Sequence, residues 1–145
     1  MNFSGTDSFT YEISDGMGGF AQAVVTITIN GMPVVGDDNY TIAEDGSIVP
    51  GGVAQNLLFN DSDPDGDALT VNVVPITATT NGMLTLNPDG TFTYVPDENY
   101  NGLDGFSYEV TDGNGGVEQG SVVILITPVN DAPIVGADAF SVQNN

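Results

Sequence analysis

The sequence predicts an all-β fold, a Greek-key β-sandwich, on three observations. Short runs of alternating apolar and polar residues are separated by turn-forming residues, the pattern of half-buried strands. Nineteen Gly and eight Pro among 145 residues supply the turns. No segment shows sustained helical periodicity. A hydrophobic content of 40% is enough for a buried core, so we do not expect a disordered acidic chain.

The chain contains an internal repeat. Residues 2–29 align with residues 99–126 at an offset of 97, which pairs Tyr11 with Tyr108 and Asp15 with Asp112. After a length change of three residues, "NGMPVVGDDNYTI" from Asn30 aligns with "NDAPIVGADAFSV" from Asn130. We therefore divide the chain into three parts: 1–32 holds the last strands of a preceding repeat, 33–131 is a complete repeat, and 132–145 is the first strand of a following repeat.

Seven strands are expected within the complete repeat. They lie at 39–44, 54–59, 68–74, 82–87, 91–96, 105–111 and 117–127. The sequence "NPDG" at 87–90 predicts a tight hairpin turn, and "DGNGG" at 112–116 predicts a second hairpin connection.

The missing residue types exclude several functions. Lys, Arg, His, Cys and Trp are absent, and the formal net charge is -20. Without cations the chain has no phosphate clamp, which excludes nucleic acid and anionic membrane surfaces as partners. No apolar run is long enough to insert into a membrane. Without His, Cys or Lys most nucleophile-and-base catalysis is unavailable. The remaining carboxylate, hydroxyl and amide oxygens are ligands suited to calcium or magnesium.

An acidic loop stands out in "FNDSDPDGDALTV", residues 59–71. It places Asp61, Asp63, Asp65 and Asp67 at alternate positions, where like charges repel unless a cation offsets them. Asp61, Asp63, Asp65 and Gly66 fit positions 1, 3, 5 and 6 of the helix–loop–helix calcium pattern. The twelfth position, however, is Asn72 instead of Glu, Pro64 lies inside the loop, and the flanks predict strands. Cation binding is the favoured interpretation. The alternative is a hydrated acidic turn, because Asp, Pro and Gly all favour turns.

The motifs "LDGFSYEVTDGNGG" and "VNDAP" resemble the end of a cadherin repeat. With "GDDNYTIAEDGSI" and "NDSDPDGDALTV", nearly the whole chain is similar to the bacterial cadherin-like, immunoglobulin-like tandem repeats of large secreted surface proteins and adhesins. This resemblance implies a location outside the cell or on the bacterial surface. It also implies Ca²⁺ at the junctions between successive repeats, with ligands from both neighbours and from the linker.

The resemblance assigns ligands to both ends of the complete repeat. Asp63, Asp65 and Asp112 would lie at the upstream end, and Asp61 and Asp67 would complete the loop or bind a second ion. At the downstream end the implied ligands are Glu44, Asp104, Asn130 and Asp131. The upstream linker has Gly31 where the downstream linker has Asp131, so we expect one ligand fewer at the upstream junction.

The expected function is architectural: a spacer repeat that calcium stiffens, with neighbouring repeats of the same polypeptide as partners. A carbohydrate- or protein-binding module is the alternative, with a glycan or surface ligand held by Tyr40, Tyr100 and the loop 76–82. An enzyme using two carboxylates is not expected, since nothing indicates a cleft. Residues 1–32 supply strands with open edges and an apolar face that needs a partner. Three outcomes are open: the strands fray, pair with the central sandwich, or pair with another chain in a homodimer by strand exchange, which would be a property of this fragment.

Overall fold

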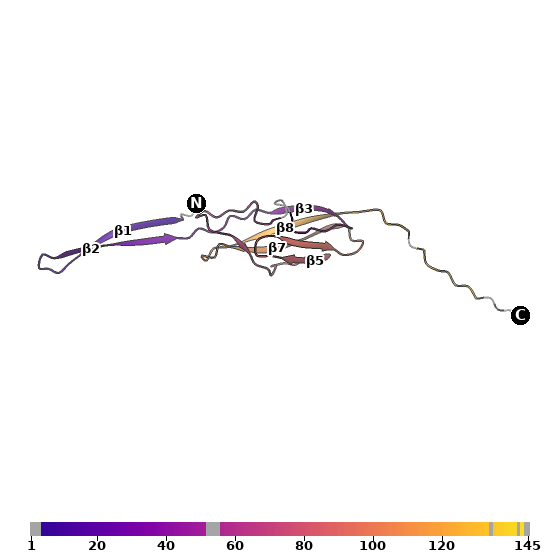
Figure 1. Ribbon diagram of the computed structural model, residues 1–145. Helices are drawn as coiled ribbons and strands as arrows, with labels where there is room; N and C mark the ends of the chain where they lie inside the picture. The colour runs from indigo at the N-terminus through magenta and orange to yellow at the C-terminus, as the bar shows by residue number, and fades with distance from the viewer. Residues whose placement is uncertain (1–3, 52–55, 134, 142, 144–145) are drawn as a thin grey trace.

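The computed structural model describes residues 4–51, 56–133, 135–141 and 143. Within them the chain forms eight strands and no helix, which confirms the all-β prediction. Strands β1 (Gly5–Ser14) and β2 (Phe20–Ile29) pair as an antiparallel hairpin separate from the other strands. The hairpin extends from one end of the molecule, and the C-terminal segment leaves from the opposite end (Figure 1).

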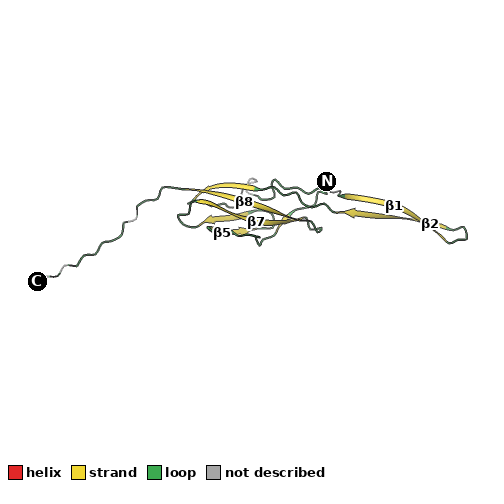
Figure 2. Ribbon diagram, turned by 180° about the vertical axis from the view of Figure 1, so that it is seen from behind, coloured by secondary structure: helices red, strands yellow, loops and turns green. Residues whose placement is uncertain are grey.

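The central repeat is a β-sandwich (Figure 2). One sheet has the order β3 (Asp38–Ala43), β8 (Val117–Thr127), β7 (Gly102–Thr111) and β4 (Thr70–Val71). The first pair, β3 with β8, is parallel, and the other pairs are antiparallel. Strands β5 (Gly82–Leu86) and β6 (Phe92–Pro96) form the second layer as an antiparallel hairpin. The chain crosses from one sheet to the other and back, as a Greek-key sandwich requires.

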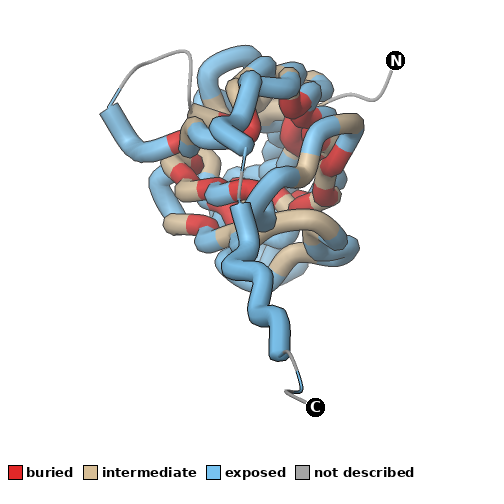
Figure 3. The backbone as a smooth tube through the Cα atoms, turned by 90° about the vertical axis from the view of Figure 1, so that its right-hand side faces the viewer, coloured by how far each residue is buried: buried red, intermediate tan, exposed pale blue. Residues whose placement is uncertain are grey.

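The core lies between these layers because alternate residues of each strand point inward. In β7 the inward residues are Phe106, Tyr108 and Val110, all at most 3% exposed. They pack with inward residues of other elements: Ile48, Leu57, Val71, Leu86, Phe92, Tyr94, Val122, Ile124 and Ile126. Figure 3 shows buried positions interspersed with exposed ones along the sandwich, whereas the described residues of the C-terminal segment are exposed. Each fully buried large apolar side chain stabilises the folded state by about 1.5–3 kcal/mol relative to an exposed one.

Two of the strand predictions were wrong over most of their length. Of 54–59, residues 54 and 55 lie outside the described residues, and Asn56 forms only an isolated bridge before a turn. Of 68–74, only Thr70 and Val71 pair. The cause is the same at both places: an Asn side chain captures a backbone N–H two residues on. Leu58 donates to Oδ1 of Asn56 at 2.8 Å, and Val74 donates to Oδ1 of Asn72 at 3.1 Å.

The β1–β2 hairpin has the same turn as the β7–β8 hairpin, which supports the internal repeat. Oδ1 of Asp15 accepts the Gly19 N–H at 2.9 Å, and Oδ1 of Asp112 accepts the Gly116 N–H at 2.9 Å. The predicted turn at 87–90 is present as well, with Gly90 donating to the Asn87 carbonyl at 3.1 Å and joining β5 to β6. The β1–β2 hairpin differs from the β7–β8 hairpin in one respect: no second layer of described strands covers it, so its apolar residues are exposed.

Candidate metal centre

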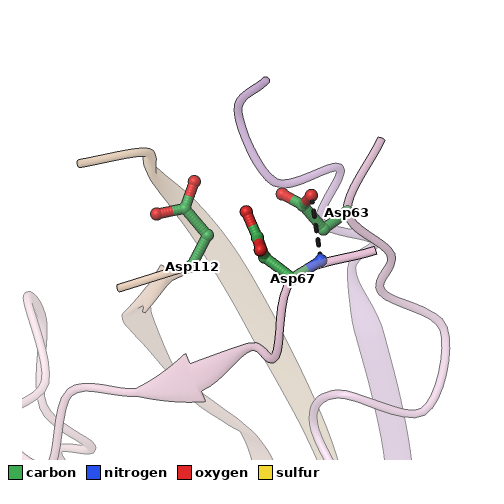
Figure 4. A group of neighbouring side chains, drawn as sticks. All are labelled: Asp63, Asp67 and Asp112. Carbon is green, nitrogen blue, oxygen red and sulfur yellow. Dashed lines mark hydrogen bonds between the residues drawn. The ribbon is translucent and has the colours of Figure 1, made fainter. Parts of the chain in front are cut away.

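Three carboxylates meet at the end of the sandwich that faces the β1–β2 hairpin. Asp112 follows the last residue of β7, and Asp63 and Asp67 lie in the acidic loop that precedes β4. One oxygen from each lies within 4.8 Å of the others (Figure 4). Among the residues that the structure describes, no other three acidic side chains approach this closely. We refer to Asp63, Asp67 and Asp112 as the acidic triad.

Asp63 shapes the loop through its first carboxylate oxygen. Oδ1 accepts the backbone N–H of Asp65 at 2.8 Å and that of Asp67 at 3.3 Å. Gly66, with φ of 80°, allows the bend that brings Asp67 back toward Asp63. The second oxygen, Oδ2, is buried and has no hydrogen-bond partner among the described residues. An unpaired buried carboxylate oxygen is costly, so this oxygen is a candidate position for a cation or a bound water.

Asp112 is held as an anion in a fixed orientation. It is only 4% exposed. Oδ1 accepts N–H groups from Asn114 and Gly116, and Oδ2 accepts the side-chain amide of Asn30 at 2.7 Å. Burial raises the pKa of Asp112, but these donors outweigh burial and hold the pKa below its ordinary value. The carboxylate is therefore ionised at neutral pH and available to a cation.

The linker between hairpin and sandwich joins this site. Besides the Asn30 contact, the Gly31 N–H donates to Oδ2 of Asp65 at 2.6 Å. Gly31, expected to be only a missing ligand, thus uses its backbone to hold the acidic loop. A cleft of about 500 Å³ opens here, lined from both sides of the junction by Gly5, Thr6, Thr28, Asn30, Asp65, Asp67 and Asn114.

Asp61 lies apart from the triad. Its Oδ1 accepts the Gly36 N–H at 2.9 Å, and its Oδ2 is buried without a partner among the described residues. Burial raises the pKa of Asp61. Burial also raises the pKa of Asp38 to about 6, although the Tyr108 hydroxyl, 3.1 Å from Oδ2 of Asp38, donates to it and acts in the opposite direction. The charges of Asp61 and Asp37 raise it further.

The downstream candidates form no comparable cluster among the described residues. Glu44 accepts the Val129 N–H at 2.6 Å and the Asn101 amide at 3.2 Å, which ties it to the outgoing linker. Asp104 is 8% exposed and accepts N–H groups from Thr80, Asn81 and Gly105. It also accepts the hydroxyl of Tyr94 at 2.8 Å. Among the described residues, neither Glu44 nor Asp104 belongs to a group of three converging acidic side chains. Asn130 and Asp131 are exposed on the linker.

The residues expected for a carbohydrate site make contacts within the fold. The ring of Tyr40 packs edge-on against Phe92 at 5.1 Å between ring centroids. The Tyr100 hydroxyl donates to the Leu103 carbonyl at 2.8 Å. In the loop 76–82, the Thr77 hydroxyl lies 2.6 Å from the Ser107 hydroxyl. These contacts use both Tyr side chains for packing and hydrogen bonding within the repeat.

Sequence reasoning missed two residues of this region. Asn30 supplies the linker contact to Asp112, and the repeat alignment already paired it with the candidate ligand Asn130. Asp38 has the raised pKa, and the only sequence signal was the adjacent acidic pair Asp37–Asp38 at the start of a strand. Neither residue lies in the acidic loop, so proximity in sequence did not point to them.

The sandwich, the hairpin with the same turn and the acidic junction between them define the class: a β-sandwich repeat with a candidate cation site at the junction. The chain belongs to the bacterial cadherin-like domain family, whose model matches residues 30–128. The model of the bacterial Ig domain matches residues 1–28. Cadherin-like domains generally bind Ca²⁺, and domains of these two families typically occur in extracellular proteins. No helix in the described part of the chain has the length and apolarity to span a membrane.

Solved structures similar to this chain include two endo-fucoidan hydrolases from glycoside hydrolase family 107. For MfFcnA4 the identity is 17% and the TM-score 0.47, and the match covers 88% of this chain and 19% of the hydrolase chain. For MfFcnA9 the identity is 17% and the TM-score 0.40, with coverage of 86% and 22%. The chain thus spans about a fifth of the length of these enzymes. No curated protein matches it.

Proposed function

We propose that this chain is a calcium-binding spacer repeat of a bacterial surface adhesin or other extracellular protein, without catalytic activity. The observation that carries the proposal is the acidic triad. Its three carboxylates converge within 4.8 Å, and one of their oxygens is buried without a hydrogen-bond partner among the described residues. The chain has no Lys or Arg to neutralise them.

Electrostatics explains why the triad favours an ion. Two unit charges 4.8 Å apart repel by about 3 kcal/mol at an effective dielectric constant of about 20. Three such pairs act against the folded state unless a cation lies between them. Calcium takes oxygen ligands, usually six to eight, so the triad would supply part of the shell, with linker oxygens and water for the rest.

The position of the triad explains the proposed stiffening. Asp63 and Asp67 come from the acidic loop, and Asp112 from the β7–β8 connection. The linker contacts both, through Asn30 to Asp112 and through Gly31 to Asp65. Neutralising the triad removes the repulsion that opposes this docking of the linker. The hairpin and the sandwich then hold one orientation, and an array of such repeats becomes a rod.

The expected energetic effect is measurable. Extracellular calcium modules bind with dissociation constants of about 10⁻⁴ to 10⁻³ M. Calcium at 100 times that constant stabilises the folded state by about 2.7 kcal/mol per site. This is a large share of the free energy of unfolding of a typical domain, which is roughly 5–15 kcal/mol.

The test is thermal unfolding after chelation, repeated across calcium concentrations, with magnesium as the comparison ion. A midpoint that climbs with calcium and hardly with magnesium supports the site. A midpoint that rises equally with either ion, or with plain salt, shows diffuse screening and overturns it. Asp67→Asn is the informative variant, because no described residue donates a hydrogen bond to the Asp67 carboxylate. We therefore expect the variant to keep its fold. Asp45→Asn, at an exposed position, is the control.

Stiffening needs its own measurement. One fluorescent dye is placed at the hairpin tip and a second on the sandwich, and the efficiency of energy transfer between them is measured in single molecules. The spread of these efficiencies reports how freely the hairpin moves relative to the sandwich. Calcium should narrow the spread in the native chain and leave it unchanged in Asp67→Asn. A junction that is already narrow in chelator would leave calcium binding intact but remove the stiffening role.

A further inference from the structure

One side of the sandwich is built from a stretch without charged residues. Residues 68–88 contain no Asp or Glu, although the chain has 20 such residues. The stretch follows the edge of β7, first as β4 and then through a bridge from Thr77 to Ser107, and it continues into β5. It therefore supplies one edge of each layer. We refer to residues 68–88, all of which the structure describes, as the neutral side.

The neutral side also exposes apolar side chains. Met83 is 74% exposed and Val74 68%, and Val73 and Ile76 are 49% and 45% exposed. Exposed apolar residues that gather in one region mark interaction surfaces. Because the chain carries a net charge of -20, a region free of carboxylates is where a second copy can approach with the least repulsion.

β5 has an open edge within the neutral side. It pairs with β6 in antiparallel register, with Leu84 opposite Tyr94. The N–H and the carbonyl of Tyr94 both bond to Ile48, so they face away from β5. The two residues of such a pair direct their backbone groups away from each other, so the N–H and the carbonyl of Leu84 face away from β6. No described residue bonds to either group.

We propose that β5 pairs with β5 of a second copy in antiparallel register, about a two-fold axis at Leu84. The Leu84 N–H of each copy then donates to the Leu84 carbonyl of the other, so the open edge is its own complement. Met83 lies opposite Thr85 of the second copy on the outer face and gains cover there. The two β5–β6 hairpins become one four-stranded sheet. Because both copies use the same surface, the contact closes at a dimer.

A second copy fits this edge because it brings the same carboxylate-free stretch and the same unpaired donor and acceptor. The net charge of -20 on each copy still opposes association at long range, and salt screens this repulsion beyond about 10 Å at 0.1 M. We therefore expect the dimer to strengthen with salt. β5 lies between the two ends of the sandwich (Figure 1). The contact uses no residue of the acidic triad, so it should form in chelator as well as in calcium.

Sedimentation equilibrium of the full chain in chelator, at low and at high salt, tests the proposal. At high salt the average mass should rise with concentration from the 15.0 kDa of one chain toward twice that value. Met83→Asp should return the chain to the monomer, because it places two carboxylates in the contact. Met17→Asp, the same change at a position 94% exposed between β1 and β2, should leave the dimer intact. A monomer at all concentrations, growth beyond two copies, or equal loss in both variants would overturn the proposal.

Disulfide formation tests the register, because the chain has no native Cys. A mixture of Met83→Cys and Thr85→Cys chains should form mixed disulfides under mild oxidation. The two positions form a pair without hydrogen bonds, whose Cα atoms lie about 4.5 Å apart, and a disulfide needs about 4.4–6.8 Å. Each variant alone should react poorly, because the two copies of one position are offset by about 7 Å along the strand. Mixed disulfides that form no faster than those of a single variant would contradict the register.

Discussion

The side-chain amide of Asn30 donates a 2.7 Å hydrogen bond to Oδ2 of Asp112, across 82 residues of sequence. This contact joins the linker after β2 to the connection between β7 and β8. It orients the most buried member of the acidic triad and fixes where the hairpin enters the junction. The linker is thereby part of the candidate site as well as a covalent connection.

Asn30→Ala should destabilise the central repeat by about 1–2 kcal/mol in chelator, because Asp112 loses a donor to a buried charge. Urea unfolding followed by circular dichroism measures this. The matched control is Asn130→Ala, which removes the equivalent residue of the exposed downstream linker and should change stability by less than about 0.5 kcal/mol. Equal losses in the two variants would show that the Asn30–Asp112 bond contributes nothing particular.

Asp104→Ala should lower the free energy of unfolding by about 3 kcal/mol. The decrease should be the same with and without calcium. The change leaves the N–H groups of Thr80 and Asn81 and the Tyr94 hydroxyl without their shared acceptor. Asp67→Asn should behave in the opposite way, with little change in chelator and a reduced response to calcium. The two variants, unfolded in parallel with and without calcium, separate a structural carboxylate from a ligand. A calcium-dependent loss in Asp104→Ala would instead make Asp104 a ligand.

Asp38 should make the protein less stable as pH rises from about 4 to about 6. Burial raises its folded-state pKa to about 6, above the ordinary value of 3.8. The folded state therefore binds the proton more tightly than the unfolded state, and this advantage disappears once both forms are ionised. Asp38→Asn, which keeps an acceptor for Tyr108, should stabilise the protein at pH 7 by about 1 kcal/mol after allowance for solvent screening.

The measurement is the unfolding free energy in chelator at several pH values between 4 and 7. The difference between Asp38→Asn and the native chain should be small at pH 4 and largest at pH 7. Asp131→Asn, an exposed carboxylate on the linker, serves as the control for the loss of one charge. A difference that does not vary with pH would show that the Asp38 proton is not linked to folding.

Gly116→Ala should weaken the calcium response, because a Cβ at this position would overlap the carboxylate of Asp112. The side chain must rotate away and lose its place in the triad. Calorimetric titration should show affinity reduced by about tenfold, the equivalent of about 1.4 kcal/mol. Gly51→Ala, where a Cβ meets open space, is the control. Unchanged affinity in Gly116→Ala would mean that Asp112 does not contact the ion.

The repeat and most strands were readable from the sequence. Strand 117–127 was predicted with its observed bounds, and the turn at 87–90 was predicted from Pro and Gly at set positions. These features depend on alternation and turn chemistry over a few residues, which sequence displays directly. The strand prediction at 68–74 failed because the Asn72 side chain took a backbone donor, a local competition that alternation does not reveal.

By itself, the sequence determined the fold class, the absence of any side-chain cation and the presence of an acidic loop, since all three are properties of composition and local pattern. Only the tertiary structure decided which carboxylates act together. Asp63 and Asp67 meet Asp112 because β4 pairs with β7, which brings two distant segments to one end of the sandwich. Asp104 instead lies where β5–β6 and its preceding loop surround it with donors. The sequence shows where the carboxylates lie along the chain, but the environment of each carboxylate depends on long-range strand pairing.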